Sequence, residues 1–390
     1  INTVKNIAPT FGGINLEDIK APEAFEIEER LKAELPIPVM HDDQHGTAII
    51  SAAALLNALE LAEKKIEEVR VVVSGAGSAA IACIKLYALL GVRKENIVMF
   101  DSKGAISKGR EGLSDKQIEF ATSRQIKSLG EALENADVFL GLSIGGVLKP
   151  EMLSSMAKDP IVFAMANPDP EIDYDLAIKT RKDIIMATGR TDFPNQVNNV
   201  LGFPYIFRGA LDVRATKINE EMKMAAVKAL AKLAKEPVPE QVNIAYAETR
   251  LNFGRDYIIP KPFDPRLITE IPPAVAKAAM ESGVAQNPIK DWEAYKEELL
   301  ERMGSEDKIT RLLINRAKQN PKRIVYAEAD HLDVLKAAQQ VYDEKIAIPI
   351  LLGRRDVILE LMTEIEFEGE DIIIIDPKSD EEEKKRNEYA

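Results

Sequence analysis

The sequence predicts an α/β fold built around a doubly wound parallel sheet. Between residues 69 and 212, short apolar runs alternate with segments of helical periodicity. The runs are apolar at successive positions, as expected for strands buried on both faces. A second, shorter α/β pattern begins near residue 305. We therefore expect one complete sheet domain, preceded by part of another domain and followed by the start of a second α/β domain.

The segment before the sheet is expected to be short strands and helices. Residues 14–16 and 37–40 are apolar runs that predict strands. Between them Pro22 stands at the start of an expected helix, which places Glu28 on its outer, solvent-facing side. Gly46 is expected to open a long apolar helix that ends at residue 61.

Five apolar runs are expected to form the sheet, with helices such as residues 78–90 between them. These runs are residues 71–73, 97–100, 138–140, 161–164 and 184–186. After residue 212 the pattern changes to helices, one expected over residues 216–235, and to proline-rich connections that include Pro272 and Pro273. The second pattern predicts helices and strands over residues 306–319, 323–326, 332–343, 349–352 and 372–375.

Composition and charge exclude several classes of protein. Hydrophobic residues make up 46% and charged residues 29%, a globular balance, and the net charge of −13 disfavours nucleic acid and anionic membranes as partners. No apolar run approaches the roughly 20 residues that span a bilayer. The single cysteine, Cys83, excludes an internal disulfide framework, fits a reducing cytoplasm and is expected to be a packed, inert thiol. Because the chain opens on Ile1, we expect a segment of a longer polypeptide.

A glycine-bearing turn is the clearest motif. The string after the first sheet strand has the pattern G-x-G-x-x-A and comprises Gly75, Ala76, Gly77, Ser78, Ala79 and Ala80. Gly75 permits a tight turn, Gly77 lets the backbone approach a pyrophosphate, and the helix start supplies N–H donors. A turn that binds nothing is the alternative. We favour a Rossmann-like site for a dinucleotide.

The end of the second sheet strand bears on the choice of cofactor. Asp101 lies where an acid binds the ribose of a dinucleotide. Ser102 and Lys103 follow it, and Lys108 and Arg110 are close. An acid suits a free 2′-hydroxyl, whereas nearby cations suit a 2′-phosphate. We predict NADP over NAD, with NAD and a merely solvated basic loop as the alternatives.

Two acidic pairs, Glu17-Asp18 and Asp42-Asp43, end the first two apolar runs. At adjacent strand ends they would face one cleft, where three carboxylates suit Mg²⁺ or Mn²⁺ and leave positions open for substrate oxygens. Surface acids at loop starts are the alternative. His41 and His45 flank the second pair, but Gly46 places them on a turn, and we expect supporting histidines rather than ligands.

Asparagines follow two of the later strands. Asn167 follows the strand at residues 161–164, and Asn198 and Asn199 lie in a turn-rich string after the last strand. Strand carboxyl ends line the ligand crevice of a doubly wound fold, where a side-chain amide binds a carboxamide or a carboxylate. Turn chemistry is the alternative, and we prefer it for Asn195.

Together these strings resemble the malic enzyme family over about residues 1–300. The supporting strings are residues 9–19, 41–48, 75–80, 166–168 and 196–200. The region after about residue 305 looks like the beginning of a phosphate acetyltransferase domain. The combination resembles the bacterial, multidomain NADP-type malic enzymes. It divides the chain into the end of an N-terminal domain (1–45), the NAD(P)-binding domain (46–212), a helical return segment and linker (213–304), and a phosphate acetyltransferase-like start (305–390).

The resemblance implies metal-dependent oxidative decarboxylation of malate to pyruvate and CO₂, with reduction of NADP. It implies that Glu17, Asp18 and Asp43 bind Mg²⁺ or Mn²⁺. Asp42 would be a supporting carboxylate that does not bind the metal directly. The family's catalytic tyrosine and lysine lie upstream of its Glu-Asp string, so these roles are assigned to no residue of this sequence.

The resemblance also implies contacts with substrate, cofactor and effector. Asn167 and Asn199 would contact malate, and Asn198 would lie near the nicotinamide. Acetyl-CoA is implied as an effector of the complete C-terminal domain, and a homo-oligomer is expected. Two other functions stay open: another NAD(P)-dependent dehydrogenase, such as an amino-acid dehydrogenase, and a non-catalytic regulatory or assembly protein that senses acetyl-CoA.

Overall fold

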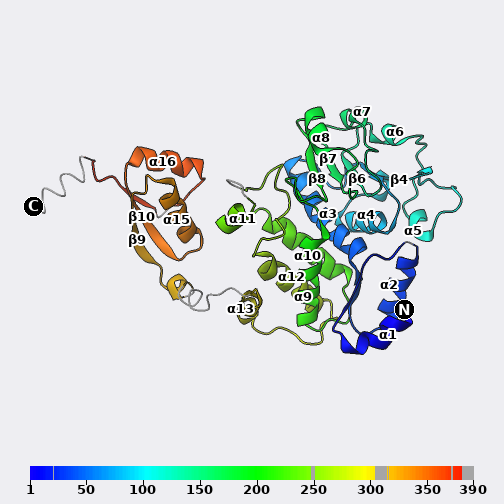
Figure 1. Ribbon diagram of the computed structural model, residues 1–390, viewed down its shortest axis with the longest axis horizontal. Helices are drawn as coiled ribbons and strands as arrows, with labels where there is room; N and C mark the ends of the chain where they lie inside the picture. The colour runs from blue at the N-terminus through cyan, green and yellow to red at the C-terminus, as the bar shows by residue number, and fades with distance from the viewer. Residues whose placement is uncertain (21, 247–250, 304–313, 315, 370–371, 380–390) are drawn as a thin grey trace, which may run out of the picture. The chain divides into compact units, whose positions relative to one another are not determined.

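The computed structural model describes residues 1–390 except residues 21, 247–250, 304–313, 315, 370–371 and 380–390 (Figure 1). The chain divides into two compact units, residues 1–300 and 301–390. Among the described residues, no helix combines the length and the apolar character needed to cross a bilayer. The finer boundaries at residues 45 and 212 stay predictions.

The first unit is built on a six-stranded sheet, which contains the five strands that the sequence predicts and one short edge strand, at residues 104–105, that it does not. The strands lie in the order β5-β4-β3-β6-β7-β8, and every neighbouring pair is parallel except the edge pair of β4 with β5. Their bounds are β3 Val71–Ser74, β4 Ile97–Asp101, β5 Gly104–Ala105, β6 Val138–Gly141, β7 Ile161–Ala164 and β8 Ile185–Thr188. Because the order reverses at β3, a ligand crevice is expected where the carboxyl ends of β3 and β6 diverge.

Helices cover both faces of this sheet, which explains why its strands are apolar at successive positions. Val71 and Val73 of β3 face one hydrophobic core, and Val72 faces the other. The first core contains α3 (Asp42–Leu61) and α4 (Ser78–Leu90). The second contains the short helices α6 (Leu129–Leu133), α7 (Pro150–Ser154) and α8 (Tyr174–Thr180). Figure 1 shows the two groups of helices on opposite sides of the sheet.

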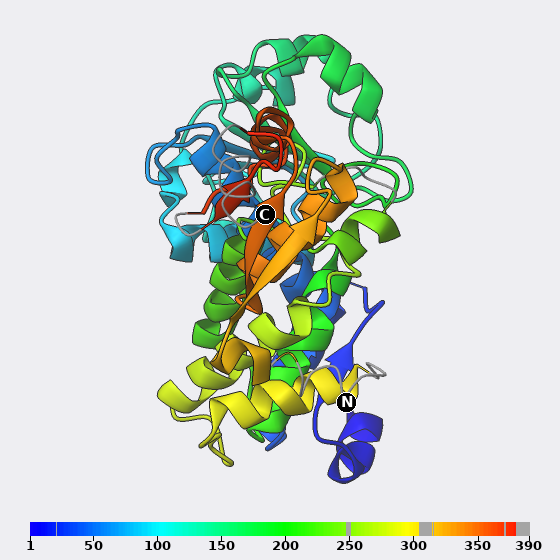
Figure 2. The same cartoon turned by 90° about the vertical axis from the view of Figure 1, so that its left-hand side faces the viewer.

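Further helices follow the sheet in the first unit. They are α9 (Phe203–Asp212), α10 (Glu220–Leu233), α11 (Glu240–Ala245), α12 (Leu267–Glu281) and α13 (Trp292–Arg302). Helices α9, α10 and α12 extend the first core, whereas Val242 of α11 belongs to a separate small core. Figure 2 shows most of these helices, in green and yellow, at the end of the unit away from α6, α7 and α8. The expectation that Pro272 and Pro273 lie in a connection is wrong, because both lie inside α12. The buried apolar face of α12 against α9 and α10 outweighs the hydrogen bonds that the two prolines cannot donate.

The N-terminal segment forms two parallel strands, β1 (Ile14–Leu16) and β2 (Val39–His41), with α1 (Asn2–Ile7) and α2 (Glu23–Glu34) beside them. The start of α3 differs from the prediction. It begins at Asp42, directly after β2, so His45 lies in the first helical turn and not in a turn before the helix. Two acids in that turn favour this early start through the helix dipole. Gly46 makes room for the Asp42 carboxylate, whose Oδ1 would lie 2.1 Å from a Cβ there.

The described part of the first unit also contains short helical turns between these elements. They are the 3₁₀ turns η1 (Ala8–Thr10), η2 (Lys94–Asn96) and η3 (Asn199–Leu201), and α5 (Asp115–Ile118). Helix α5 begins with a capping box in which the Ser114 side chain accepts from the Gln117 N–H and the Gln117 side chain returns to Ser114. This box fixes the loop that leads away from β4 and β5.

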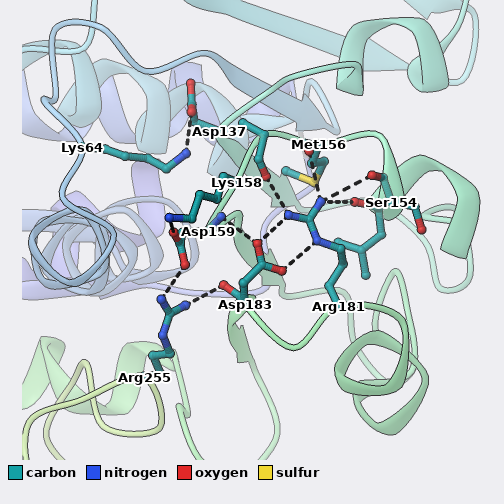
Figure 3. Close-up of polar contacts among 11 residues, drawn as sticks. Lys64, Asp137, Ser154, Met156, Lys158, Asp159, Arg181, Asp183 and Arg255 are labelled. Carbon is teal, nitrogen blue, oxygen red and sulfur yellow. Dashed lines mark hydrogen bonds and ion pairs between the residues drawn. The ribbon is translucent and has the colours of Figure 1, made fainter.

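The amino-terminal ends of the sheet strands are joined by a network of charges (Figure 3). Asp137 precedes β6, accepts a hydrogen bond from Lys64 at 2.6 Å and accepts another from the backbone N–H of Arg70 at 2.8 Å. Arg181 pairs with Asp183 at 2.6 Å and donates to carbonyl oxygens that follow α7. Because these residues precede strands, the network lies at the sheet edge opposite the ligand crevice.

The second unit is a small α/β layer. Its parallel strands, in the order β11-β10-β9, are β9 (Lys322–Ala327), β10 (Ala347–Leu352) and β11 (Ile373–Ile375). Helices α15 (Leu332–Asp343) and α16 (Arg355–Glu364) pack with them around a small core. These elements confirm the predictions for residues 323–326, 332–343 and 349–352, whereas most of the helix predicted over residues 306–319 lies outside the described residues.

Candidate active site

The two acidic pairs meet at one end of the β1–β2 pair. Because Leu16 pairs with His41 in parallel register, both strands end at the same edge and both acidic pairs follow directly. The backbone N–H of Asp18 donates to Asp43 Oδ2 at 2.9 Å. Asp18 itself has a positive φ of 56°, a conformation that Asp tolerates better than most residues. The sequence prediction that the two strand ends face one place is therefore confirmed.

Asp42 is the buried member of this acidic group. Its side chain is only 1% exposed, and its Oδ2 accepts a hydrogen bond from Asn199 Nδ2 at 2.7 Å. Its Oδ1 is buried and has no hydrogen-bond partner in the described part of the chain. Burial, followed by the charges of Glu17 and Asp43, raises the pKa of Asp42 to about 7. The site therefore carries more negative charge than its own hydrogen bonds compensate.

The chemistry of this group fits a hard divalent cation. Carboxylate oxygens are the ligands that Mg²⁺ and Mn²⁺ prefer, and a cation would offset the repulsion that raises the Asp42 pKa. In the side-chain positions of the described residues, no three His, Cys, Asp or Glu side chains already form a metal-binding group. Glu17 and Asp18 are exposed and able to reorient. The assignment of Glu17, Asp18 and Asp43 as ligands stays a prediction.

A buried polar network joins the start of α3 to α2 and α10. Glu28 Oε1 accepts from the backbone N–H of His41 at 2.9 Å, and the Glu28 carboxylate also contacts Lys32 and the His45 ring. The other ring nitrogen, His45 Nδ1, lies 3.1 Å from the Nζ of Lys223 on α10. Burial is the main reason why the pKa of His45 falls to about 4, so the ring is neutral at pH 7.

This network corrects one prediction and reveals two residues that sequence reasoning missed. Glu28 is 5% exposed, although the helical pattern placed it outside. Its position is explained by the partners that β2 and α3 bring to it. Lys223, a buried ammonium on the apolar side of α10, was also missed. The available signal for Glu28 was its spacing. It lies three positions before the buried Leu31, so the two residues are on the same face of the helix.

The glycine turn after β3 has the geometry expected of a dinucleotide site. Gly75 has a φ of 124°, and a Cβ there would lie 2.5 Å from the carbonyl oxygen of Leu142. Gly77 caps α4, and a Cβ there would meet no atom within 4 Å, so the backbone is open to a ligand. Ala80, in the third motif position, is buried where α4 packs on the sheet. The loop of residues 75–79 therefore presents the helix start to the crevice.

Asp101 at the end of β4 is neutralised within its own loop. Arg110 forms an ion pair with Asp101 and also donates to the carbonyl oxygens of Gly104 and Ala105. The backbone N–H of Lys103 donates to Asp101 Oδ1 at 2.8 Å. Burial alone would raise the pKa of Asp101, but these contacts keep it below its usual value. Ser102 and Lys103 are exposed at the rim.

The predicted asparagines differ in their surroundings. Asn167 is exposed just after β7 and precedes a cis peptide bond to Pro168. Asn199 is tied to Asp42, as described above, which joins the loop after β8 to the acidic group. Asn198 caps η3, because its Oδ1 accepts from the Val200 N–H at 3.0 Å. Asn195 is buried and bridges Met186 and residues 255–258, so it has a structural role.

Comparisons with known families and relatives agree with this geometry. Residues 44–247 match the family model described as malic enzyme, NAD binding domain, and residues 308–390 match phosphate acetyl/butaryl transferase. The NADP-dependent malic enzyme of Salmonella typhimurium is 52% identical over 385 residues, 97% of this chain and 51% of that protein. The NAD-dependent malic enzyme of Rhizobium meliloti is 50% identical over 97% of this chain and 50% of its own length. The chain thus spans about half the length of these relatives.

Shorter relatives and solved structures give the same picture. The NADP-dependent malic enzyme of Halomonas elongata is 59% identical over 288 residues, 74% of this chain and 68% of that protein. The crystal structure of malic enzyme from Pyrococcus horikoshii is 40% identical, with a TM-score of 0.69 over 80% of this chain and 71% of that chain. The Entamoeba histolytica malic enzyme is 34% identical, with a TM-score of 0.69 over 94% of this chain and 69% of that chain.

Proposed function

Because the chain belongs to the malic enzyme family, we propose that it carries the metal and cofactor sites of an enzyme that oxidises malate with NADP and releases CO₂ and pyruvate. The observation that best supports this proposal is the junction of Asp18, Asp43 and Asp42 with Asn199. It brings an acid that follows β1, two acids that begin α3 and an amide that follows β8 to one place. An amino-acid dehydrogenase has no need of such a carboxylate group.

We propose Glu17, Asp18 and Asp43 as the ligands of one Mg²⁺ or Mn²⁺. When bound, the metal would act as a Lewis acid toward the substrate oxygens. Asp42 would stay behind the ligands, because its Oδ2 is occupied by Asn199 and its side chain is buried. Its carboxylate would orient the Asn199 amide, whose remaining hydrogen-bonding atoms are proposed to contact malate.

The substrate would lie between this acidic group and the loop after β7. Asn167 is exposed there and offers an uncharged amide to a malate carboxylate. Asn198 is proposed to lie near the nicotinamide, although its carbonyl oxygen is engaged as a cap. The general base and general acid are assigned to none of the described side chains.

The cofactor proposal rests on the two loops that follow β3 and β4. Gly75, Ala76, Gly77, Ser78 and Ala79 are proposed to bind the pyrophosphate through backbone N–H groups at the start of α4. Overall identity does not choose between NAD and NADP, since relatives named for each are about equally similar. Local charge favours NADP: Arg110 neutralises Asp101, and Lys103 and Ser102 are exposed beside it.

Three wider proposals follow from the family and from the second unit. The C-terminal match to a phosphate acetyltransferase family supports acetyl-CoA as an effector of the complete domain. A homo-oligomer and a cytoplasmic location are proposed as well, the latter consistent with the single, buried cysteine. None of these three proposals is needed for the chemistry at the acidic group.

The test is malate-dependent reduction of NADP by the protein that contains this chain. Wild-type protein is expected to be active with Mn²⁺, to lose activity in EDTA and to form pyruvate in proportion to NADPH. Asp43→Ala is expected to abolish turnover, whereas Glu151→Ala, an exposed acid on α7, is the matched control and should leave it unchanged. Metal-independent activity, or activity with amino acids but not with malate, would refute the proposal.

A further inference from the structure

Glu171 is a buried carboxylate that the proposed reaction leaves without a role. It lies after β7, its residue is 0% exposed, and both of its oxygens accept from backbone N–H groups. Oε1 accepts from Ser143 at 3.0 Å, and Oε2 accepts from Ala166 at 3.0 Å. Ser143 belongs to the loop after β6, and Ala166 directly precedes Asn167. One side chain therefore holds the loops at the carboxyl ends of two neighbouring strands.

Backbone hydrogen bonds continue this connection in both directions. The N–H of Leu148 donates to the carbonyl oxygen of Glu171 at 2.9 Å, and the N–H of Gly146 donates to that of Pro170 at 3.1 Å. The hydroxyl of Ser143 lies 2.8 Å from that of Ser74, which directly precedes the glycine turn. The contacts at Glu171 thus reach from the proposed cofactor loop after β3 to the proposed substrate residue after β7.

The surrounding backbone is shaped to admit this carboxylate. A Cβ at Gly141, the last residue of β6, would lie 2.2 Å from Cδ of Glu171. A Cβ at Gly145 would lie 2.8 Å from Cβ of Asp169. The two glycines therefore let the loops after β6 and β7 approach closely. Neither Gly141 nor Gly145 has a positive φ, so backbone conformation does not require glycine at either position. Glycine is needed there because the two loops approach closely.

A carboxylate is suited to this position because both of its terminal atoms accept hydrogen bonds. A glutamine amide would accept a hydrogen bond only through its oxygen. Its NH2 group would face the other backbone N–H, and two donors cannot form a hydrogen bond. A buried carboxylate is also costly in folding when no cation offsets it, since burial disfavours its charged form. Such a cost is expected at a residue that fixes the geometry of a functional site and does not serve stability alone.

We propose that Glu171 is a positioning residue that holds the loops after β6 and β7 together and so fixes Asn167 in the position from which it is proposed to contact malate. This inference rests on the proposed function. Asn167 follows Ala166, whose N–H is held by Oε2, so loss of that bond frees the asparagine. Loss of the bond to Ser143 frees the loop that contacts the hydroxyl of Ser74.

The test compares Glu171→Gln with Asp137→Asn. Both replace a carboxylate that accepts a backbone N–H by an amide of the same size. Asp137 lies in the network at the opposite edge of the sheet, where it holds Lys64 and the N–H of Arg70 (Figure 3). Asp137→Asn therefore reports the effect of lost stability without any change at the crevice.

Glu171→Gln is expected to lower kcat/KM for malate roughly tenfold or more, the equivalent of one lost hydrogen bond. The dissociation constant of NADPH, measured by its fluorescence, should change less than about twofold, because the Glu171 side chain hydrogen-bonds to Ser143 and Ala166 and reaches the glycine turn only indirectly, through Ser143 and Ser74. Amide hydrogen exchange at Ser143 and Ala166 should accelerate. Asp137→Asn should lower Tm while kcat/KM and these two exchange rates stay at wild-type values.

Two results would overturn the inference. One is a loss of kcat/KM in Glu171→Gln no greater than that in Asp137→Asn. The other is wild-type exchange at Ser143 and Ala166. If Glu171→Gln does not fold, Glu171→Asp gives the same comparison with the charge kept and the reach shortened. Wild-type protein without malate oxidation would refute the proposed function itself, whereas an active wild type with an equally active variant would refute only the role of Glu171.

Discussion

Replacing Glu28 by alanine should destabilise the protein far more than any surface acid on the same helix. The change removes the acceptor for the N–H of His41 and for the His45 ring, at 2.9 and 3.1 Å, and the partner of Lys32 at 2.7 Å. A buried donor left without a partner costs about 1–3 kcal/mol. Lys32 is partly exposed and regains water, so it adds little. The expected loss is about 3–5 kcal/mol, the range for breaking a buried pair.

Urea unfolding at pH 7 measures this loss, and two further variants calibrate it. Glu28→Gln keeps one acceptor and should lose about half as much, since only one of the two buried donors remains unpaired. Glu26→Ala removes an exposed acid whose partner is Arg30 and should cost about 0.5 kcal/mol or less. If Glu28→Ala costs no more than Glu26→Ala, the buried network does not support α3 as described.

The pH dependence of the Glu28→Ala effect gives an independent check. Burial alone would raise the pKa of Glu28, but the hydrogen bond with His45, the charge that this ring gains at a pH near 4 and below, and the charge of Lys32 hold it well below 4.5. A carboxyl with a depressed folded-state pKa stabilises the protein above its unfolded pKa and loses that contribution as the pH falls below it. The destabilisation by Glu28→Ala should therefore be full at pH 7 and shrink below about pH 4.5. A constant difference down to pH 3 would contradict this assignment.

Three other predictions address the thiol, the cofactor and the second unit. Cys83 is buried and its pKa is raised to about 12, so a thiol reagent should not label it at pH 8 until the protein is unfolded; rapid labelling of the native protein would contradict its packing. Arg110→Ala should lower the ratio of kcat/KM for NADP to that for NAD about tenfold, because the charge of Asp101 then repels a 2′-phosphate. An unchanged ratio would show that Arg110 does not determine the cofactor preference. The 390-residue chain should show no saturable micromolar binding of acetyl-CoA by calorimetry, since the described part of the second unit has three strands and leaves Ile324 and Val325 of β9 43% and 58% exposed; such binding by a monomer would show a complete site.

The sheet and its crevice were predictable because the signal for them is local. Each strand of the six-stranded sheet except the edge strand β5 is an apolar run, and the run is apolar because helices cover both faces. The glycine turn was predictable for the same reason, since Gly75 needs a positive φ and Gly77 an open backbone. The acidic pairs were placed correctly because parallel strands end at one edge.

The errors concern residues whose environment is made by distant segments. Gly46 looked like the start of a helix, but its small size serves the carboxylate of Asp42 one turn earlier. Glu28 looked exposed because its partners come from β2 and α3. Glu171 gave no local signal at all, since its two partners are contributed by loops 5 and 28 residues away. A pattern within one helix or loop does not contain this information.

Binding of Mn²⁺ tests the central claim most directly, because the acidic group is proposed to hold one metal ion at the site of malate oxidation. The electron paramagnetic resonance signal of free Mn²⁺ measures binding without any need for turnover. The protein that contains this chain is expected to bind one Mn²⁺ per chain, more tightly when malate is present. Asp43→Ala should lose this binding while Glu151→Ala keeps it. Equal Mn²⁺ binding by wild-type protein and Asp43→Ala would contradict the account.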